Sequence, residues 1–199
     1  MIAWTIEAAL DALNADIYVS TDDDAIIEVS EKYGAHAIRR LSCNDDHSTV
    51  SQATIATLQQ LRDRGQEYDY VLQLMANCPL RDSNDIRLSF RNFTSGGYDF
   101  QLSCFKYDWI NPWWAVKLKD KYKPESIFPE ALKTRSQDLP ELFCVTGAIW
   151  IARVSELLKT DTFYGPDYTM FPIPWQHAVD IDDTEDLKMA EALKAMEGS

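Results

Sequence analysis

Two carboxylates near the end of the chain have the spacing of a metal site. Asp180 and Asp182 lie two residues apart in the segment AVDIDDTEDL. Residues two apart in a strand point to the same face, so both carboxylates would lie side by side where this segment meets the next helix. Mg²⁺ is commonly held by one or two carboxylates together with phosphate oxygens. The pair therefore predicts a Mg²⁺ site; the alternative is that Asp182 or Asp183 only caps the following helix.

Several basic or amide side chains could contact an anion in this acidic chain. Arg39 and Arg40 end a predicted strand, and Arg81 is the last residue of the turn MANCPLR. The loop KTRSQDLPE contains three more at alternate positions: Lys133, Arg135 and Gln137. The last three would point to one side if their loop were extended, which would form a local polar patch for an anion. The alternatives are a solvated loop for that patch and ordinary ion pairs for the other arginines.

The charge balance excludes broad classes of partner. The 199 residues include 32 acidic and 19 basic side chains, which gives a formal net charge of −13. A field of this sign repels phosphate backbones and anionic lipid, so we expect neither nucleic acid nor a membrane as partner. The start MIAWTIEAAL has no basic region and predicts no signal peptide. Four scattered cysteines without a C-x-x-C motif are typical of a reduced cytoplasmic protein.

The elements that must position these side chains alternate between helix and strand. Hydrophobic periodicity predicts helices over 2–14, 22–33, 50–61, 83–93, 153–159 and 184–196. Short apolar or β-branched runs predict strands over 16–20, 36–39, 69–75, 143–152 and 178–182. This alternation predicts an α/β fold with a doubly wound, mostly parallel sheet and helices on both faces, built as a single domain over 1–199.

A β-rich excursion interrupts the alternation between about 105 and 145. Runs such as WWAVKLK read as strands there, and prolines separate them. Many of the tryptophans lie in or just after this stretch. Exposed aromatic side chains would indicate a contact surface for a partner, whereas the alternative is that they fill the core. We expect a dimer contact.

A series of segments, in order along nearly the whole chain, resembles the acylneuraminate cytidylyltransferases, which make CMP-activated nonulosonic acids. The matching segments are IAWTIEAAL, VSTDDDAIIEVSEKYGA, RRLSCNDDHSTVSQATIATL, MANCPLR, RSQDLPE, TGAIWI and VDIDDTEDLKMAEAL. The resemblance implies a Rossmann-like nucleotidyltransferase that transfers CMP from CTP to an acidic nine-carbon sugar and releases pyrophosphate. It also implies a homodimer in which the β-rich excursion reaches toward the partner's active site.

The resemblance further implies roles for individual residues. Asp180 and Asp182 would hold Mg²⁺ and act in catalysis, and Asp46 and Ser48 would lie near the base or ribose. The substrate-binding positions that it implies are Arg39, Asp46, Ser48, Asn77, Arg81, Arg135, Gln137 and Thr146.

The sequence also departs from the pattern of the family. Members begin with a strand and a basic, glycine-rich loop that holds the triphosphate, whereas this chain resembles them only from just after that loop and has no glycine before Gly34. Met75 and Thr146 replace the glutamine and asparagine that are usual there. The resemblance therefore leaves two alternatives: a catalytically inactive paralogue that serves as a binding or dimerisation partner, and an enzyme for 3-deoxy-manno-octulosonate.

Overall fold

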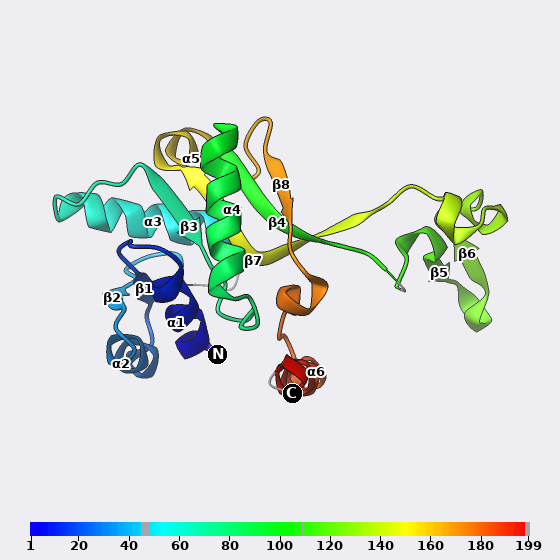
Figure 1. Cartoon of the computed structure of the whole chain (residues 1–199), viewed down its shortest axis with the longest axis horizontal. Helices are drawn as coiled ribbons and strands as arrows, with labels where there is room; N and C mark the ends of the chain where they lie inside the picture. The colour runs from blue at the N-terminus through cyan, green and yellow to red at the C-terminus, as the bar shows by residue number, and fades with distance from the viewer. Residues whose placement is uncertain (45–47, 109, 198–199) are drawn as a thin grey trace.

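A computed structural model describes residues 1–44, 48–108 and 110–197 of the chain (Figure 1). The α-helices are α1 (Ile2–Ala12), α2 (Asp24–Lys32), α3 (Val50–Asp63), α4 (Ser83–Gly96), α5 (Val154–Thr160) and α6 (Thr184–Glu197). The strands are β1 (Tyr18–Thr21), β2 (His36–Arg39), β3 (Tyr70–Gln73), β4 (Phe100–Lys106), β5 (Val116–Leu118), β6 (Pro124–Ser126), β7 (Phe143–Arg153) and β8 (Thr169–Pro172). Short 3₁₀ turns are η1 (Pro112–Trp114), η2 (Asp120–Tyr122), η3 (Ala131–Lys133), η4 (Ser136–Asp138) and η5 (Trp175–Ala178).

The strands form two sheets in the body of the molecule and one hairpin in the arm, as we call residues 107–142. In the body, β1 and β2 pair in parallel, and the larger sheet has the strand order β3-β7-β4-β8. Because β7 is antiparallel to both of its neighbours and β4 is parallel to β8, the strands β3, β4 and β8 share one direction. The α/β class with mostly parallel strands is thus confirmed, but the strands lie in two sheets rather than one.

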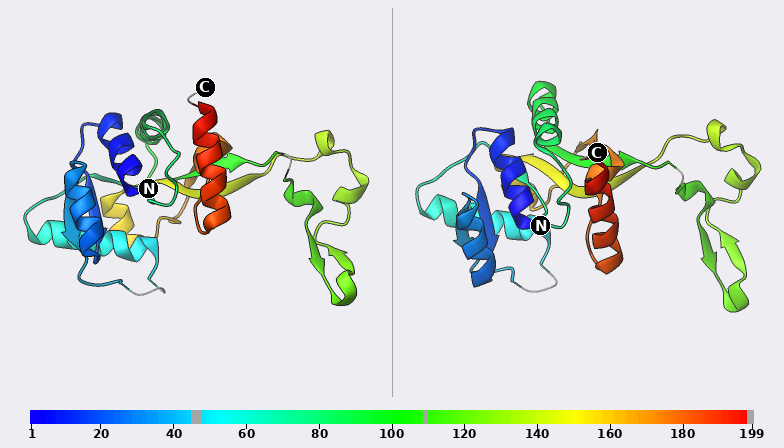
Figure 2. Two further views of the ribbon diagram at one scale, coloured as in Figure 1. Left: turned by 90° about the horizontal axis from the view of Figure 1, so that it is seen from below. Right: turned by 60° about the horizontal axis from the view of Figure 1, so that its bottom comes forward.

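The core lies on both faces of the larger sheet. Side chains alternate along β7, so that Ile149 and Ile151 pack in one cluster with Phe93 of α4, whereas Trp150 and Ala152 pack in a second cluster on the opposite face. Figure 2 shows α1 and α4 on one side of this sheet and α3 and α5 on the other. A strand that is buried on both faces has a nearly unbroken apolar sequence, which is why the sequence predicts it.

A reciprocal capping box fixes the start of α4. The Asp82 carboxylate accepts a hydrogen bond from the backbone N–H of Asp85 at 2.8 Å, and the Asp85 carboxylate accepts one from the N–H of Asp82 at 3.0 Å. These bonds satisfy two donors that the first turn of a helix leaves open. At the other end, Gly97 adopts a φ of 67°, the left-handed conformation that commonly ends helices. The helix therefore begins directly after the turn at 75–81.

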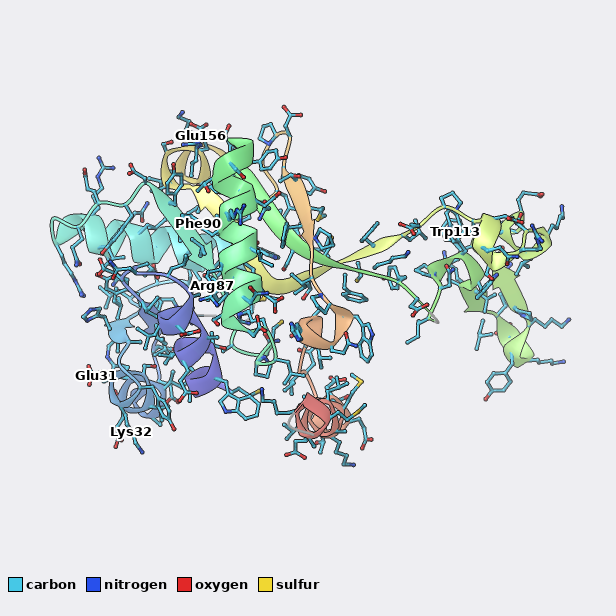
Figure 3. The ribbon with its side chains drawn as sticks, in the orientation of Figure 1. Glu31, Lys32, Arg87, Phe90, Trp113 and Glu156 are labelled. Atoms are coloured by element: carbon cyan, nitrogen blue, oxygen red, sulfur yellow. The ribbon has the colours of Figure 1, made fainter. Side chains whose placement is uncertain are left out.

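The arm leaves the body at the end of β4 and returns at the start of β7, in the stretch where the sequence predicts an excursion (Figure 1). It consists of the antiparallel hairpin β5-β6 and the turns η1 to η4. Its small internal cluster includes Trp113, whose ring centroid lies 5.0 Å from that of Phe128 and whose Nε1 donates a hydrogen bond to Pro140 O. In Figure 3 Trp113 lies within the arm, away from the helices of the body.

One expectation about the last third of the chain is wrong, and one strand there was not predicted. The strand predicted over 178–182 does not form: η5 ends at Ala178, and the residues up to the start of α6 are irregular. Instead, β8 lies earlier, at Thr169–Pro172, and pairs in parallel with β4 at the edge of the sheet. Pro172 hides this strand from sequence reasoning, because proline has no N–H for a ladder; an edge position tolerates it.

No helix among the described residues combines the length and the apolar character that crossing a membrane requires. All four cysteines are free thiols, as expected from their scattered positions. Cys78 and Cys104 are buried, whereas Cys43 and Cys144 are partly exposed.

Candidate active site

Three segments that are distant in sequence meet at one end of the larger sheet. They are the turn at 75–81, the part of β7 around Thr146, and the irregular stretch at 179–183. The backbone N–H of Ile181 donates a hydrogen bond to Asn77 O at 2.8 Å, and Thr146 Oγ1 donates one to Ala178 O at 3.4 Å. These contacts hold the aspartate-bearing stretch against the turn.

Asp180 lies at this junction beside a buried thiol. Cys78 Sγ donates a hydrogen bond to Asp180 Oδ1 across 3.6 Å. Partial burial, together with repulsion by the neighbouring Asp182 carboxylate, raises the pKa of Asp180 above its ordinary value. Burial, and then the charge of Asp180, raises the pKa of Cys78 to about 12, so this thiol is protonated at neutral pH. Because Asp182 contributes to the raised pKa of Asp180, these two carboxylates lie near enough for their negative charges to interact.

A buried cation supports the turn from inside. Arg81 is only 2% exposed, and its Nη1 donates hydrogen bonds to Met75 O at 2.7 Å and to Cys78 O at 2.5 Å. Burial lowers the pKa of Arg81 to about 10, although the Cys78 and Asp85 side chains oppose this shift. Its Nε and Nη2 have no hydrogen-bond partner within the described part of the chain. Arg81 thus acts on the site through the backbone of the turn that it holds.

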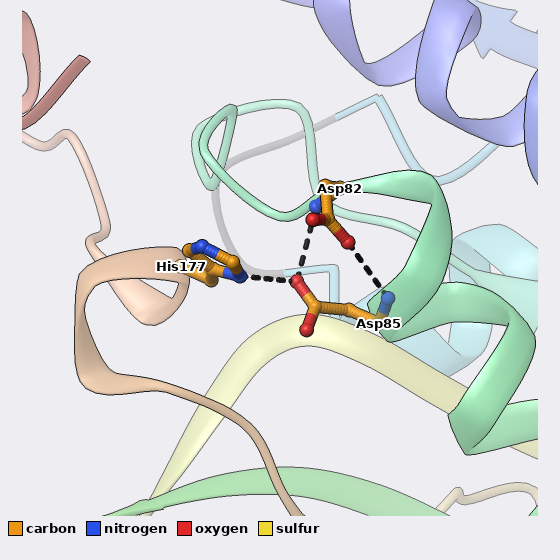
Figure 4. A group of neighbouring side chains, drawn as sticks. All are labelled: Asp82, Asp85 and His177. Atoms are coloured by element: carbon orange, nitrogen blue, oxygen red, sulfur yellow. Dashed lines mark hydrogen bonds and ion pairs between the residues drawn. The ribbon is translucent and has the colours of Figure 1, made fainter. Parts of the chain in front are cut away.

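Asp82, Asp85 and His177 form a second group of side chains at this junction (Figure 4). Their ligand atoms lie within 4.8 Å of one another, and His177 Nδ1 lies 2.6 Å from Asp85 Oδ2. That same oxygen already accepts the capping bond from the N–H of Asp82, and Arg81 supplies a positive charge nearby. A hard ion such as Mg²⁺ prefers oxygen ligands and water, so this group does not suit it. Its evident role is structural, because it joins η5 to the start of α4.

The structure brings some of the sequence-predicted residues to this junction. Four of them take part in the contacts described above: Asn77, Arg81, Thr146 and Asp180. Asp182 lies beside Asp180 and is exposed.

Other predicted residues lie elsewhere in this chain. Arg39 ends β2 in the smaller sheet, where it donates a hydrogen bond to Asp22 O at 2.9 Å and pairs with Asp24. Ser48 directly precedes Thr49, the residue that caps α3, and Asp46 lies outside the described residues. The smaller sheet and the junction therefore carry separate groups of candidates.

Arg135 and Gln137 lie on the exposed arm. The Arg135 guanidinium pairs with Asp138, with its Nε 2.7 Å from Asp138 Oδ2. Because the arm projects away from the body, these two side chains do not join the junction of their own chain (Figure 1).

Sequence reasoning missed three residues of the junction: Cys78, Asp85 and His177. Asp82 and Asp85 carry a local signal, the three-residue spacing of a capping box, but this spacing predicts only a helix start. Cys78 and His177 contact residues that are 102 and 92 positions away, respectively, so no local pattern could reveal them.

Residues 1–160 match the profile of the family described as "Cytidylyltransferase". The pseudaminic acid cytidylyltransferase of Campylobacter jejuni subsp. jejuni serotype O:23/36 (strain 81-176) is 29% identical over 196 residues, which cover 97% of this chain and 84% of that protein. The N-acylneuraminate cytidylyltransferase B of Danio rerio is 25% identical over 199 residues, which cover 96% of this chain and 44% of that protein.

Among solved structures, CMP:2-keto-3-deoxy-manno-octonic acid synthetase complexed with CTP is similar to this chain, with a TM-score of 0.68 and 16% sequence identity. The alignment covers 98% of this chain and 88% of that one. A 4-diphosphocytidyl-2C-methyl-D-erythritol synthase from Anaerococcus prevotii DSM 20548 aligns with a TM-score of 0.58 over 94% of this chain, at 14% identity. These two likenesses show the fold.

Proposed function

Because the chain belongs to the cytidylyltransferase family, a family of nucleotidyltransferases, we propose that it transfers CMP from CTP to an acidic nine-carbon sugar. In this reaction the anomeric hydroxyl of the sugar attacks the α-phosphate of CTP. A new bond forms between that oxygen and phosphorus, and the bond from the α-phosphate to the β-phosphate oxygen breaks, so pyrophosphate leaves. The hydroxyl proton passes to solvent or to a basic group.

The observation that carries the proposal is the meeting of Asp180 with the turn at 75–81. The turn is fixed by the buried Arg81, and the aspartate stretch is fixed to it by the bond from Ile181 N–H to Asn77 O. Preorganised groups of this kind stabilise developing charge without reorganisation during the reaction. The junction thus supplies the rigid support that phosphoryl-transfer chemistry, which depends on positioning, requires.

The side chains at the junction fit a divalent cation. Asp180 and Asp182 offer hard carboxylate oxygens. Burial raises the pKa of Asp180, repulsion by Asp182 raises it further, and a positive charge between the two carboxylates would relieve that repulsion. We propose that they hold Mg²⁺, which when bound would offset the phosphate charge and stabilise the transition state. Asn77 and Thr146 would then orient the substrate from the turn and from β7.

The relatives support an acidic sugar as substrate, since the Campylobacter jejuni protein reported above is named for its action on pseudaminic acid. With a net charge of −13, the chain needs local cations or a metal to accept two anionic substrates. Arg135 and Gln137 are candidates for the sugar or nucleotide contact. Because they lie on the arm, they would act on the site of a second copy.

We therefore propose a homodimer in which the arm of each copy reaches the body of the other. Large apolar side chains of the arm are exposed in the single chain, and they would be covered in such a dimer: Ile110, Trp114, Val116, Leu118, Tyr122, Ile127, Phe128 and Leu132. An exposed apolar surface of this kind is typical of an interface.

The test is pyrophosphate release by the 199-residue chain with CTP and Mg²⁺. The sugar panel contains pseudaminic, legionaminic and N-acetylneuraminic acids and 3-deoxy-manno-octulosonate, and mass spectrometry identifies the CMP-sugar. We expect release with a nine-carbon acidic sugar, and none without sugar or with CTP replaced by UTP. The double substitution Asp180→Asn with Asp182→Asn should abolish release, whereas Asp161→Asn, on a turn outside the junction, should retain it.

Two outcomes would overturn the proposal. Release with the eight-carbon sugar alone would assign the sister activity on 3-deoxy-manno-octulosonate instead. No release with any sugar, from a chain whose circular dichroism shows a folded α/β protein, would favour the inactive binding or dimerisation partner.

A further inference from the structure

Helix α6 has little cover within its own chain. Among residues 184–196 only Ala190 is buried, and it packs with Leu80 in a small cluster. The exposed side chains of the helix include Leu187 and Met189. A surface helix of a globular protein normally buries an apolar stripe along its length. The exposed sides of α6 therefore form a surface that a further element can cover.

The hairpin β5-β6 of the arm is uncovered as well. In the described part of the chain its two strands pair with each other alone, and the side chains of Val116 and Leu118 are exposed. A two-stranded hairpin that packs on nothing else is at best marginally stable in water. The hairpin therefore needs a surface to pack on, and its own chain does not supply one among the described residues.

The turn of the hairpin holds two bulky side chains in an unfavourable backbone conformation. The N–H of Lys123 donates to Asp120 O at 3.4 Å, and the two residues between them, Lys121 and Tyr122, both have a φ of 59°. Two successive positive φ values are typical of tight hairpin turns, in which Asn-Gly is the favoured sequence. For a tyrosine this conformation costs free energy, and such costs are associated with functional positions. Tyr122 is 85% exposed, so no packing within the single chain offsets the cost.

The two uncovered surfaces carry opposite charge. The hairpin tip, as we call residues 117–123, has four lysines and one aspartate, which gives a formal net charge of +3. The acidic segment, as we call residues 182–196, has five acidic and two basic side chains, which gives −3. Of the four lysines, only Lys119 has an ion-pair partner among the described residues, Glu125 at 3.0 Å. Complementary charges of this kind steer association and fix its register.

The acidic segment lies on the side of the body that faces the arm. Both views of Figure 2 show α6 between the helices α1 to α3 and the arm, and Figure 1 shows η5 on the same side. In a closed two-fold dimer the same surface of each copy meets the other. Two copies whose arms reach across to each other therefore place the hairpin of each copy at the arm-facing side of the other body.

We propose that the hairpin tip of one copy docks on α6 of a second copy. The lysines of the tip would lie against the acidic segment, and Leu118 and Tyr122 would cover exposed apolar side chains of the helix. This contact rests on the homodimer proposed above and adds the surface that receives the arm. Because α6 begins two residues after Asp182, docking also supports the aspartate-bearing stretch of the receiving copy.

Reversing the charges tests the contact. The hairpin variant combines Lys117→Glu with Lys121→Glu, and the helix variant combines Glu185→Lys with Glu191→Lys; the tip then carries −1 and the acidic segment +1. Sedimentation equilibrium measures the dissociation constant of the dimer. We expect each variant alone to raise this constant about tenfold or more. An equal mixture of the two variants should form a heterodimer within about threefold of the parent constant, because both of its contacts again pair opposite charges.

Charge reversals elsewhere on the body are the matched controls. Lys32→Glu with Lys159→Glu gives the same overall charge as the hairpin variant, and Glu28→Lys with Glu31→Lys gives that of the helix variant. These four side chains are exposed on α2 and α5, and Figure 3 labels Glu31 and Lys32 far from the arm. Both controls should leave the dissociation constant within about twofold of the parent.

Tyr122→Asn separates docking from the fold of the hairpin. Asparagine tolerates the left-handed conformation better than tyrosine does, so the unfolding free energy measured in urea should not fall. The dimer should nevertheless weaken about fivefold, because the variant removes an aromatic side chain from the contact. A tyrosine that serves only the turn would leave the dimer unchanged, which would argue against the proposed contact.

The outcomes distinguish this contact from the dimer itself. The contact is overturned if the parent is a dimer and both charge reversals leave its dissociation constant unchanged, or if the mixture associates no better than either variant alone. A parent chain that is a monomer at micromolar concentration overturns the homodimer and this contact together. Because sedimentation needs no substrate, none of these results depends on whether the chain releases pyrophosphate.

Discussion

His177 Nδ1 lies 2.6 Å from Asp85 Oδ2, although 92 residues separate the two along the chain. Asp85 belongs to the first turn of α4, and His177 belongs to η5, three residues before Asp180. The contact therefore fastens the aspartate-bearing stretch to the helix that follows the turn at 75–81. It therefore joins two parts of the candidate site that are far apart along the chain, the turn at 75–81 and the stretch at 179–183.

Removing this contact should destabilise the protein. His177→Ala leaves the buried Asp85 carboxylate without its histidine partner, and we expect the free energy of unfolding to fall by about 1–3 kcal/mol. His177→Asn should recover part of the loss, because an amide can reach the place of Nδ1. Urea denaturation measures both. His36→Ala, at an exposed position on β2, is the control and should cost less than ~1 kcal/mol. Equal losses for the two alanine variants would refute the structural role of the contact.

Replacing Asp180 with asparagine should raise the stability of the protein but lower its activity. The pKa of Asp180 is raised by burial and by Asp182, so the folded chain binds the proton more tightly than the unfolded chain does, and the ionised carboxylate costs stability at neutral pH. Without divalent cation, Asp180→Asn should therefore be more stable than the parent at pH 7. This advantage should shrink as the pH falls through the raised pKa.

The same substitution should lower pyrophosphate release by about 10²–10³-fold, the range seen when one transition-state contact is removed. Denaturation in urea at several pH values and a coupled pyrophosphate assay measure the two effects. Asp161→Asn, at a left-handed position that favours asparagine, is the control for both. An Asp180→Asn enzyme with unchanged activity would remove this residue from the mechanism.

Arg81→Ala should be severely destabilising. It removes the donor to Met75 O and Cys78 O and the positive charge that acts on the nearby Asp85. A buried acceptor that loses its donor costs about 1–3 kcal/mol, and this substitution affects two carbonyls. Arg81→Lys should cost less, because an ammonium group can still donate to both carbonyls. Arg135→Ala, which breaks an exposed ion pair on the arm, should change stability by less than ~1 kcal/mol.

The four thiols should differ in reactivity. Burial raises the pKa of Cys104, and burial together with Asp180 raises that of Cys78 to about 12, so both are protonated and shielded near pH 8. Iodoacetamide should therefore alkylate the partly exposed Cys43 and Cys144 first. Peptide mass spectrometry over time measures the order, and labelling in urea should remove the difference. Early labelling of Cys78 in the folded chain would contradict the buried turn.

Negative charges introduced on the arm should dissociate the proposed dimer. Leu118 and Leu132 are 63% and 59% exposed on the arm, and we expect Leu118→Asp combined with Leu132→Asp to shift the sedimentation of the chain from dimer to monomer. Leu88→Asp, at a 44% exposed position on α4 of the body, should leave the dimer intact. A parent chain that sediments as a monomer at micromolar concentration would refute the dimer itself.

The sequence predicts the strongly periodic elements well. Helix α3 is one example, because its apolar face recurs every three to four residues and Gly65, with a φ of 78°, follows its end. β7 is another, because burial on both faces gives it an apolar run. The prediction over 178–182 fails because apolar alternation alone does not create a strand. A ladder partner is also needed, and this stretch makes a single backbone bond to Asn77.

The candidate site is less accessible to sequence reasoning. The metal-type spacing of Asp180 and Asp182 is a local signal, and so is the capping box of Asp82 and Asp85. The contact of Cys78 with Asp180 spans 102 residues and depends on how the sheet brings its strand ends together. Burial of Arg81 is likewise a tertiary property, since a lone arginine after a turn is ordinarily exposed.

The arm is inserted between β4 and β7, which are neighbours in the larger sheet. The entropy of closing such a connection depends only on the logarithm of its length, with ~0.6 kcal/mol for each doubling. Residues can therefore be gained or lost in the arm at little thermodynamic cost to the body. Over evolutionary time the arm can therefore change in length and outer surface while the strands β4 and β7 on either side of it stay constrained by the core.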